Sequence, residues 1–215
     1  MTFSIAALGD ALRAELGLEK YKKINAPGAI CFEKQNSETS VELIFSYYHM
    51  VDGYSFRTGV SGRKSFSEIE NILAKYYKKY HISRDLGTIH KSSAKINFES
   101  PFFDYQITSE VTLKEVKPML MEWVYGDVLP FLDRYQNIED VYREMESMPL
   151  LERNYFIRDP MPVRSLIMKG LLKTDDFLEY GDFLEKVFSE NKDKPYYKYE
   201  IKYFNELYQE LKNIQ

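Results

Sequence analysis

Residues 40–61, SVELIFSYYHMVDGYSFRTGVS, contain two β-prone segments on either side of Val51-Asp52-Gly53. In both segments apolar or aromatic side chains recur at alternate positions, as they do on one face of an extended strand. Asp-Gly between such segments predicts a β-hairpin, because both residues tolerate the positive φ of a type I′ turn. We therefore expect this hairpin to form the centre of an antiparallel sheet.

Helices are predicted before and after the hairpin. The first, capped by Thr2 or Ser4, has apolar residues at helical spacing and ends before Gly17. The second begins at a Ser65/Glu68 capping box. Its apolar arc consists of Phe66, Ile69, Leu73, Tyr76, Tyr77 and Tyr80. Its lysines lie between these positions, so we expect the tyrosines to point inward and the lysines to face solvent.

Further strands and helices are predicted from shorter patterns. A first strand spans 29–32, and alternation of apolar and polar residues predicts two more at 94–98 and 103–113. Pro118 suits the first turn of the next helix, which Pro130 should kink. Asn137 is expected to cap a short helix that ends near residue 145.

The order of these segments resembles a known bacterial family. The resemblance is carried by Leu16-Gly17-Leu18 at the end of the first helix, by Leu129-Pro130-Phe131-Leu132-Asp133-Arg134-Tyr135, and by Ile138-Glu139-Asp140-Val141. These motifs are similar to those of the bacterial domain-of-unknown-function family 4304, over residues 1–147. The resemblance implies an α+β sandwich and an interaction role such as toxin neutralisation. It implies no catalytic residue.

Residues 148–215 differ in character from the preceding part. Three prolines indicate an irregular linker over 149–162, and helical spacing of apolar residues follows in three segments up to residue 211. In the last helix two adjacent apolar rows indicate packing on more than one side. We therefore predict an α+β fold: an antiparallel sheet with helices packed on one face in 1–147, followed by a helical C-terminal extension or cap, 148–215, packed on it.

Composition limits the classes of function. The chain has 215 residues and a formal net charge of −4, which disfavours nucleic acid as a partner. Its single cysteine, Cys31, excludes an internal disulfide, and no apolar run is long enough to span a membrane. A cytoplasmic protein is expected. The 18 tyrosines and 14 phenylalanines predict an aromatic core and rim, or else a tyrosine-lined binding surface.

No motif in the sequence indicates chemistry. His49, His81 and His90 lack metal-ligand spacing, and Cys31 in an apolar strand is typical of an inert core residue. No catalytic residue, metal site or cofactor is predicted, and whether the protein is an enzyme stays open, with a non-enzyme favoured. The one candidate small site is an anion-binding site at Arg57, Arg63 and Lys64, near a helix start.

Three functional hypotheses remain. The favoured one is a protein-binding or immunity-type module that binds another protein or itself through an acidic surface. The residues of this surface are Asp175, Asp176, Glu179 and Asp182. The alternative is a small-ligand protein or enzyme with a pocket between sheet and helices. Nucleic-acid binding through the basic segment 63–95 is the third.

Overall fold

The computed structural model describes residues 3–56, 59–84, 86–93 and 105–214. The fold is α+β, as predicted, and the chain forms two compact units. The first comprises residues 1–64 and 90–134, and the second residues 65–89 and 135–215. This division differs from the predicted one, because residues 65–89 and 135–147 group with the C-terminal helices. The strand predicted at 94–98 lies outside the described residues.

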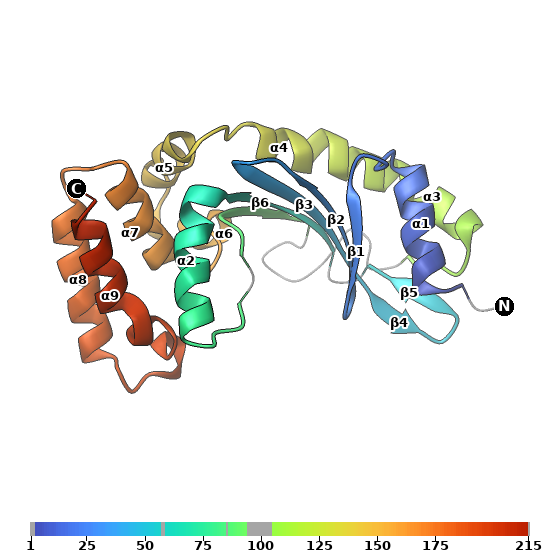
Figure 1. The fold of residues 1–215 in the computed structure, drawn as a ribbon. Coiled ribbons are helices and arrows are strands. Elements are labelled where there is room, and N and C mark those ends of the chain that lie inside the picture. The colour runs from blue at the N-terminus through green and yellow to red at the C-terminus, as the bar shows by residue number, and fades with distance from the viewer. Residues whose placement is uncertain (1–2, 57–58, 85, 94–104, 215) are drawn as a thin grey trace. The chain divides into compact units, whose positions relative to one another are not determined.

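The first unit is built on a five-stranded antiparallel sheet with the strand order β1-β2-β3-β6-β7 (Figure 1). The strands are β1 (Lys22–Ala26), β2 (Ala29–Gln35), β3 (Thr39–Ser46), β6 (Val60–Phe66) and β7 (Ile89–Ser92). The predicted first strand is therefore β2, whereas β1 had not been predicted. β3, which contains residues 40–46 of the quoted stretch, is the middle strand, whereas the Asp-Gly hairpin that was expected at the centre lies outside this sheet. The chain passes into the second unit near the end of β6 and returns near the start of β7.

The Asp-Gly hairpin forms, but not as predicted. It consists of β4 (Tyr48–Met50) and β5 (Gly53–Ser55), which make a separate two-stranded sheet. Met50 pairs with Gly53, so the turn residues are Val51 and Asp52, and neither Asp52 nor Gly53 has a positive φ. Gly53 is required by close packing instead, because a Cβ there would lie 2.3 Å from the carbonyl oxygen of Ile107. The predicted type I′ turn is therefore wrong.

The helices of the first unit are α1 (Ile5–Glu15), α3 (Glu110–Met121), a π-helical segment (Glu122–Val128) and α4 (Leu129–Asp133). Ser4 caps α1, and Gly17 follows it with a φ of 65°, as predicted. The strand predicted at 103–113 is wrong as far as the structure describes it: residues 105–109 contain only an isolated bridge at Ile107, and Ser109 and Thr112 form a capping box that starts α3. Residues 103 and 104 lie outside the described residues. Pro118 consequently lies inside α3 and not at its start.

The helical run from α3 to α4 follows one face of the sheet (Figure 1). Gly62 on β6 allows this close approach, since a Cβ there would lie 2.3 Å from Val128. Lys64, two residues further and hence on the same face, donates to the carbonyl oxygen of Leu132 at 3.3 Å. Helices thus pack on a face of the sheet, as the sequence predicted.

The second unit consists of helices. They are α2 (Ser67–Lys79), α5 (Ile138–Ser147), α6 (Leu150–Phe156), α7 (Met161–Leu171), α8 (Phe177–Glu190), a 3₁₀ turn (Pro195–Tyr197) and α9 (Glu200–Lys212). Asn137 caps α5 as predicted. The predicted Ser65/Glu68 capping box is wrong, because β6 continues to Phe66. α6 lies in the segment predicted to be an irregular linker.

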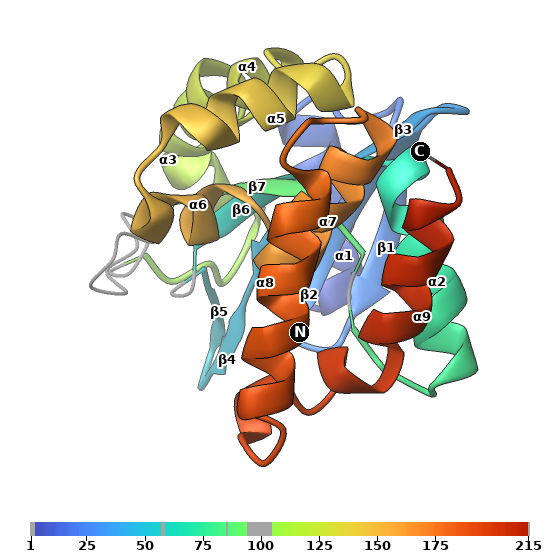
Figure 2. The same ribbon diagram turned by 90° about the vertical axis from the view of Figure 1, so that its left-hand side faces the viewer.

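α7 is the central helix of this unit. It packs against α2, α5, α8 and α9, and residues 161 and 163–170 are all buried. Figure 2 shows α8 and α9 side by side next to α7. Residues of both apolar rows of α9 are buried, as expected from its wide arc: Tyr203 and Leu207 in one row, and Phe204, Tyr208 and Leu211 in the other. Gly181 on α8 lets the ring of Tyr208 lie against the helix backbone, since a Cβ at this position would come within 2.2 Å of that ring.

Candidate functional site

Arg164 on α7 is held by a complete set of partners. Its side chain is 0% exposed, and its Nε and Nη2 donate to the two carboxylate oxygens of Glu70 on α2, at 2.9 and 2.8 Å. Its Nη1 donates to the carbonyl oxygens of Arg158 and Asp159. Thr88 also donates to Glu70, at 2.9 Å. A buried charge that is paired and fully hydrogen-bonded in this way has a structural role.

Lys169, the second buried cation of α7, is also fully engaged. Its Nζ lies 2.6 Å from Asp176, 3.0 Å from the hydroxyl of Tyr142 and 3.4 Å from Glu146. Burial alone would lower the pKa of Lys169, but the bonds to Asp176 and Tyr142 raise it above its usual value. The ammonium also lies 5.3 Å from the ring centroid of Tyr180. These contacts tie α5 and α8 to α7.

A third ionic group is formed by Arg84, Asp159 and Glu200. Nη1 of Arg84 lies 2.5 Å from Oε1 of Glu200 and 3.2 Å from Oδ2 of Asp159. Glu200 is only 3% exposed, yet its Oε2 has no hydrogen-bond partner among the described residues. Burial raises the pKa of Glu200 above its usual value, although Arg84 acts against this shift. A buried carboxylate oxygen without a donor is costly, so this position needs an explanation.

Glu200 and Asp159 both line a groove in the helical unit. The groove has a volume of about 400 Å³ and is bounded by α6, α7, α8 and the 3₁₀ turn. Its lining residues are Leu150, Leu151, Asn154, Asp159, Pro160, Met161, Pro162, Tyr180, Phe183, Leu184, Val187, Phe188, Tyr196, Tyr197 and Glu200. The lining is thus mainly apolar and aromatic, with two carboxylates and no lysine or arginine.

Several apolar side chains at this groove face solvent. Leu150 and Leu151 at the start of α6, Phe183 on α8 and Tyr196 in the 3₁₀ turn are all exposed. Single exposed apolar residues are ordinary, but a cluster around a concavity is typical of a binding surface. We therefore take this groove as the candidate functional site.

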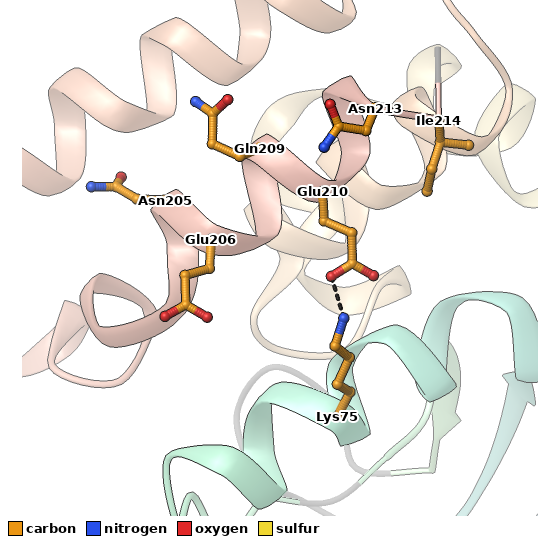
Figure 3. A pocket seen from close by; sticks show the side chains of 7 residues that line it. All are labelled: Lys75, Asn205, Glu206, Gln209, Glu210, Asn213 and Ile214. Atoms are coloured by element: carbon orange, nitrogen blue, oxygen red, sulfur yellow. Dashed lines mark hydrogen bonds and ion pairs between the residues drawn. The ribbon is translucent and has the colours of Figure 1, made fainter.

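A second depression runs along α9 (Figure 3). It is lined by Lys75, Asn205, Glu206, Gln209, Glu210, Asn213 and Ile214. Figure 3 shows Lys75 of α2 reaching the carboxylate of Glu210 of α9, with which it forms an ion pair. Glu210 also accepts a hydrogen bond from the hydroxyl of Tyr76. Because all three charged groups here, Lys75, Glu206 and Glu210, serve contacts between α2 and α9, this depression is the weaker candidate.

The predicted anion-binding residues do not converge in the structure as far as it describes them. Arg63 forms an ion pair with Glu42 on β3, whereas Lys64 is buried and donates to Leu132. As neighbours in β6 these two side chains point to opposite faces of the sheet. Arg57 lies outside the described residues. The anion site stays a prediction.

The predicted acidic surface lies on α8 and just before it. Asp175, Asp176, Glu179 and Asp182 are all exposed. Asp176 is bound to Lys169, and Asp182 accepts a hydrogen bond from Tyr208, so these two also hold the helices together. Binding of a partner by these residues remains a prediction.

None of the groups considered for chemistry is among the residues that line the groove. Cys31 is buried in β2, and His49 and His81 are exposed at a strand and a helix end. No cluster of three or more metal-ligating side chains occurs in the described parts of the chain. Tyr76 and Tyr77 are buried and the lysines of α2 are exposed, as predicted. Base stacking on these tyrosines would therefore require them to leave the core.

Sequence reasoning did not find the groove. Its two carboxylates are 41 residues apart in sequence, and Arg84 precedes both by more than 70 residues. A usable signal was the apolar pair Leu150-Leu151, which follows Pro149 in the segment predicted to be an irregular linker. An apolar pair in a segment without predicted helix or strand indicates a surface that another molecule can cover.

Comparison with known proteins adds no relative. No protein-family model, curated protein or solved structure matches this chain. The resemblance to family 4304 therefore remains a prediction from the motifs at residues 16–18, 129–135 and 138–141. Among the described helices, none has both the length and the apolar composition that a membrane crossing requires.

Proposed function

We propose that the protein is a non-catalytic binding protein, and that the groove of its helical unit holds a segment of another protein. The observation that carries this proposal is the group of exposed apolar side chains around the groove: Leu150, Leu151, Phe183 and Tyr196. Covering such side chains removes apolar surface from water, at about 25 cal/mol per Å². Neutralisation of a toxin, the role implied by the resemblance to family 4304, would be one form of such binding. We propose the cytoplasm as its location.

The walls of the groove support this proposal, because they are firmly held. Tyr180 and Phe183 project from α8, which is fixed to α7 through Lys169 and Asp176. Phe188 packs edge-on against Phe204 of α9, with ring centroids 4.8 Å apart. A groove on rigid helices loses little conformational entropy when a partner binds.

The test is a charge placed inside the groove. Phe183→Asp places a carboxylate in the apolar lining, and Leu178→Asp is the matched control, because both residues lie on α8. Phe183 is 58% exposed and Leu178 is 55% exposed, but Leu178 does not line the groove. Tagged wild-type and variant proteins would be used for affinity capture from a lysate of the source cells, and the bound proteins would be quantified.

We expect a stoichiometric partner that is captured by the wild-type protein and by Leu178→Asp but not by Phe183→Asp. If the partner is a second copy of the chain, light scattering should show a molecular mass that rises with protein concentration for the wild type but not for Phe183→Asp. Equal capture by all three proteins would refute a role for the groove. Circular dichroism should show the same helical content for both variants, since both sites are exposed.

A small ligand is the second candidate, because the volume of about 400 Å³ is within the range of small-molecule sites. This pocket would lie among the helices of the second unit. Thermal-shift screening of amphiphilic compounds tests it. A compound that stabilises the wild-type protein but not Phe183→Asp, together with no protein captured, would favour the small ligand.

A further inference from the structure

The groove contains an excess of negative charge. Among its lining residues the charged ones are Asp159 and Glu200. Arg84 contacts both carboxylates through one nitrogen atom, so this group of three has a net charge of −1. Of the two buried cations of α7, Arg164 is matched by Glu70, since it binds both oxygens of that carboxylate. Lys169 contacts two carboxylates, as Arg84 does, but one of them, Glu146, is also paired with Arg153. Only at the groove is a buried carboxylate oxygen, Oε2 of Glu200, without a donor in the described part of the chain.

The aromatic walls favour the same kind of ligand. Tyr180, Phe183, Phe188, Tyr196 and Tyr197 all line the groove. The face of an aromatic ring attracts a cation within about 6 Å of its centroid. Another aromatic ring of the second unit already contacts a cation in this way, because Arg84 lies 5.1 Å from the ring centroid of Tyr199. Carboxylates and aromatic faces together select an organic cation.

The shape of the cation follows from the two acceptors. Asp159 has a side chain that is 68% exposed, whereas Oε2 of Glu200, in the same ionic group, is buried. A guanidinium has five N–H donors in a planar fork, so one such group can bind two carboxylates and stack on a ring at the same time. An ammonium is a more compact and more strongly hydrated charge and fits this arrangement less well.

The exposed apolar side chains around the groove indicate whether the guanidinium belongs to a protein segment or to a free compound. Leu150, Leu151 and Tyr196 are exposed at the mouth of the groove, where a small free cation would leave them uncovered. A peptide segment with apolar residues next to the cationic one would cover them. This favours a protein segment over a free guanidino compound.

We propose that the groove recognises an arginine side chain that stands next to apolar residues in a segment of a partner protein. This inference rests on the proposed function and names the chemistry of its partner. The arginine binds Asp159 and Glu200 between the aromatic walls, and the apolar neighbours cover Leu150 and Leu151.

The experiment is a selection from a display library of random short peptides against the immobilised wild-type protein. We expect the enriched peptides to share one arginine flanked by apolar residues. Synthetic copies of an enriched peptide, with arginine or with its neutral analogue citrulline, would then be measured by fluorescence anisotropy. Because a hydrogen-bonded ion pair is replaced by a neutral contact, binding of the citrulline peptide should be at least about tenfold weaker.

Variants of the protein complete the test. Asp159→Asn, at an exposed carboxylate, should weaken the arginine peptide about tenfold without affecting the fold. Glu200→Gln should do the same, with circular dichroism as the check on folding, since this side chain is buried. Asp193→Asn is the matched control, because Asp193 is exposed but lies outside the groove, and it should leave binding unchanged.

The outcomes separate the two proposals. Enriched peptides that lose binding to Phe183→Asp but contain no arginine, or bind equally well with citrulline, would overturn this inference and leave the proposed function standing. No enriched peptide, or peptides that bind Phe183→Asp as well as the wild type, would overturn both. Agmatine binding as tightly as the arginine peptide would show that a free guanidino compound, and not a protein segment, is the ligand.

Discussion

Replacing Glu70 by leucine tests the buried ion pair that organises the helical unit. In Glu70→Leu the guanidinium of Arg164 stays in a fully buried position without a counter-charge. It loses hydrogen bonds of 2.9 and 2.8 Å, and Thr88 loses its acceptor at Glu70. Removing one partner of a buried pair costs about 3–5 kcal/mol. Two bonds between charged groups, at about 1.5–3 kcal/mol each, give a similar sum.

We therefore expect the free energy of unfolding of Glu70→Leu to fall by about 3–5 kcal/mol. In the double variant Glu70→Leu/Arg164→Met, apolar groups replace both charges, so at least half of this loss should be recovered. The remaining loss reflects the carbonyl oxygens of Arg158 and Asp159, which then lack the donor that Arg164 provides.

The assay is urea unfolding followed by circular dichroism, with hydrogen exchange at α7 to report on the helical unit. Glu190→Gln is the control, because Glu190 belongs to an exposed pair with Lys186 and should change stability by less than about 0.5 kcal/mol. A loss below about 1 kcal/mol in Glu70→Leu, or no recovery in the double variant, would refute the reasoning.

Two further predictions concern the same unit. Gly181→Ala should lower the free energy of unfolding by about 1–3 kcal/mol, since the added Cβ would lie 2.2 Å from the ring of Tyr208; unchanged urea unfolding would contradict this packing. Partial burial acts to raise the pKa of Asp176, but hydrogen bonds from Lys169 and Thr174 lower it below its usual value. A depressed carboxyl pKa stabilises the fold above the unfolded value of about 3.9, and this stability is lost as the pH falls below it. Stability measured at pH 6 and pH 3 should therefore fall less in Asp176→Asn than in the wild type, and an equal fall in both would exclude a contribution from this carboxylate.

Local signals in the sequence predicted those elements whose patterns match their packing. α1, α2, α5 and α7 have caps or apolar arcs that the structure uses directly. The start of α3 was predicted wrongly because residues 103–113 also alternate with period two. Val111, which this alternation placed among the apolar positions of a strand, is 68% exposed on the helix. Leu113, Val116 and Leu120 form its buried face, and this helical spacing becomes visible only beyond the alternating segment.

Close contacts between distant segments could not be predicted. The turn at Val51 and Asp52 depends on the approach of the Ile107 backbone to Gly53, which has no sequence signal. The groove could not be predicted for the same reason, because its two carboxylates come from distant segments: Asp159 precedes α7 and Glu200 begins α9. An acidic residue at a helix start is ordinary in a sequence. Only the tertiary structure shows that one oxygen of Glu200 is buried without a donor among the residues described.

The two separate chain segments of the helical unit have a consequence for its synthesis on the ribosome. The inward face of α2 is made early, but α7, which covers part of it, begins at Met161, about 80 residues after α2 ends. At about 5–20 residues per second, this apolar face waits roughly 4–16 s for its partner. Nascent chains are therefore vulnerable to aggregation during that interval. Slower translation of residues 80–160 would lengthen the exposure, and a chaperone that binds the emerging α2 would protect it.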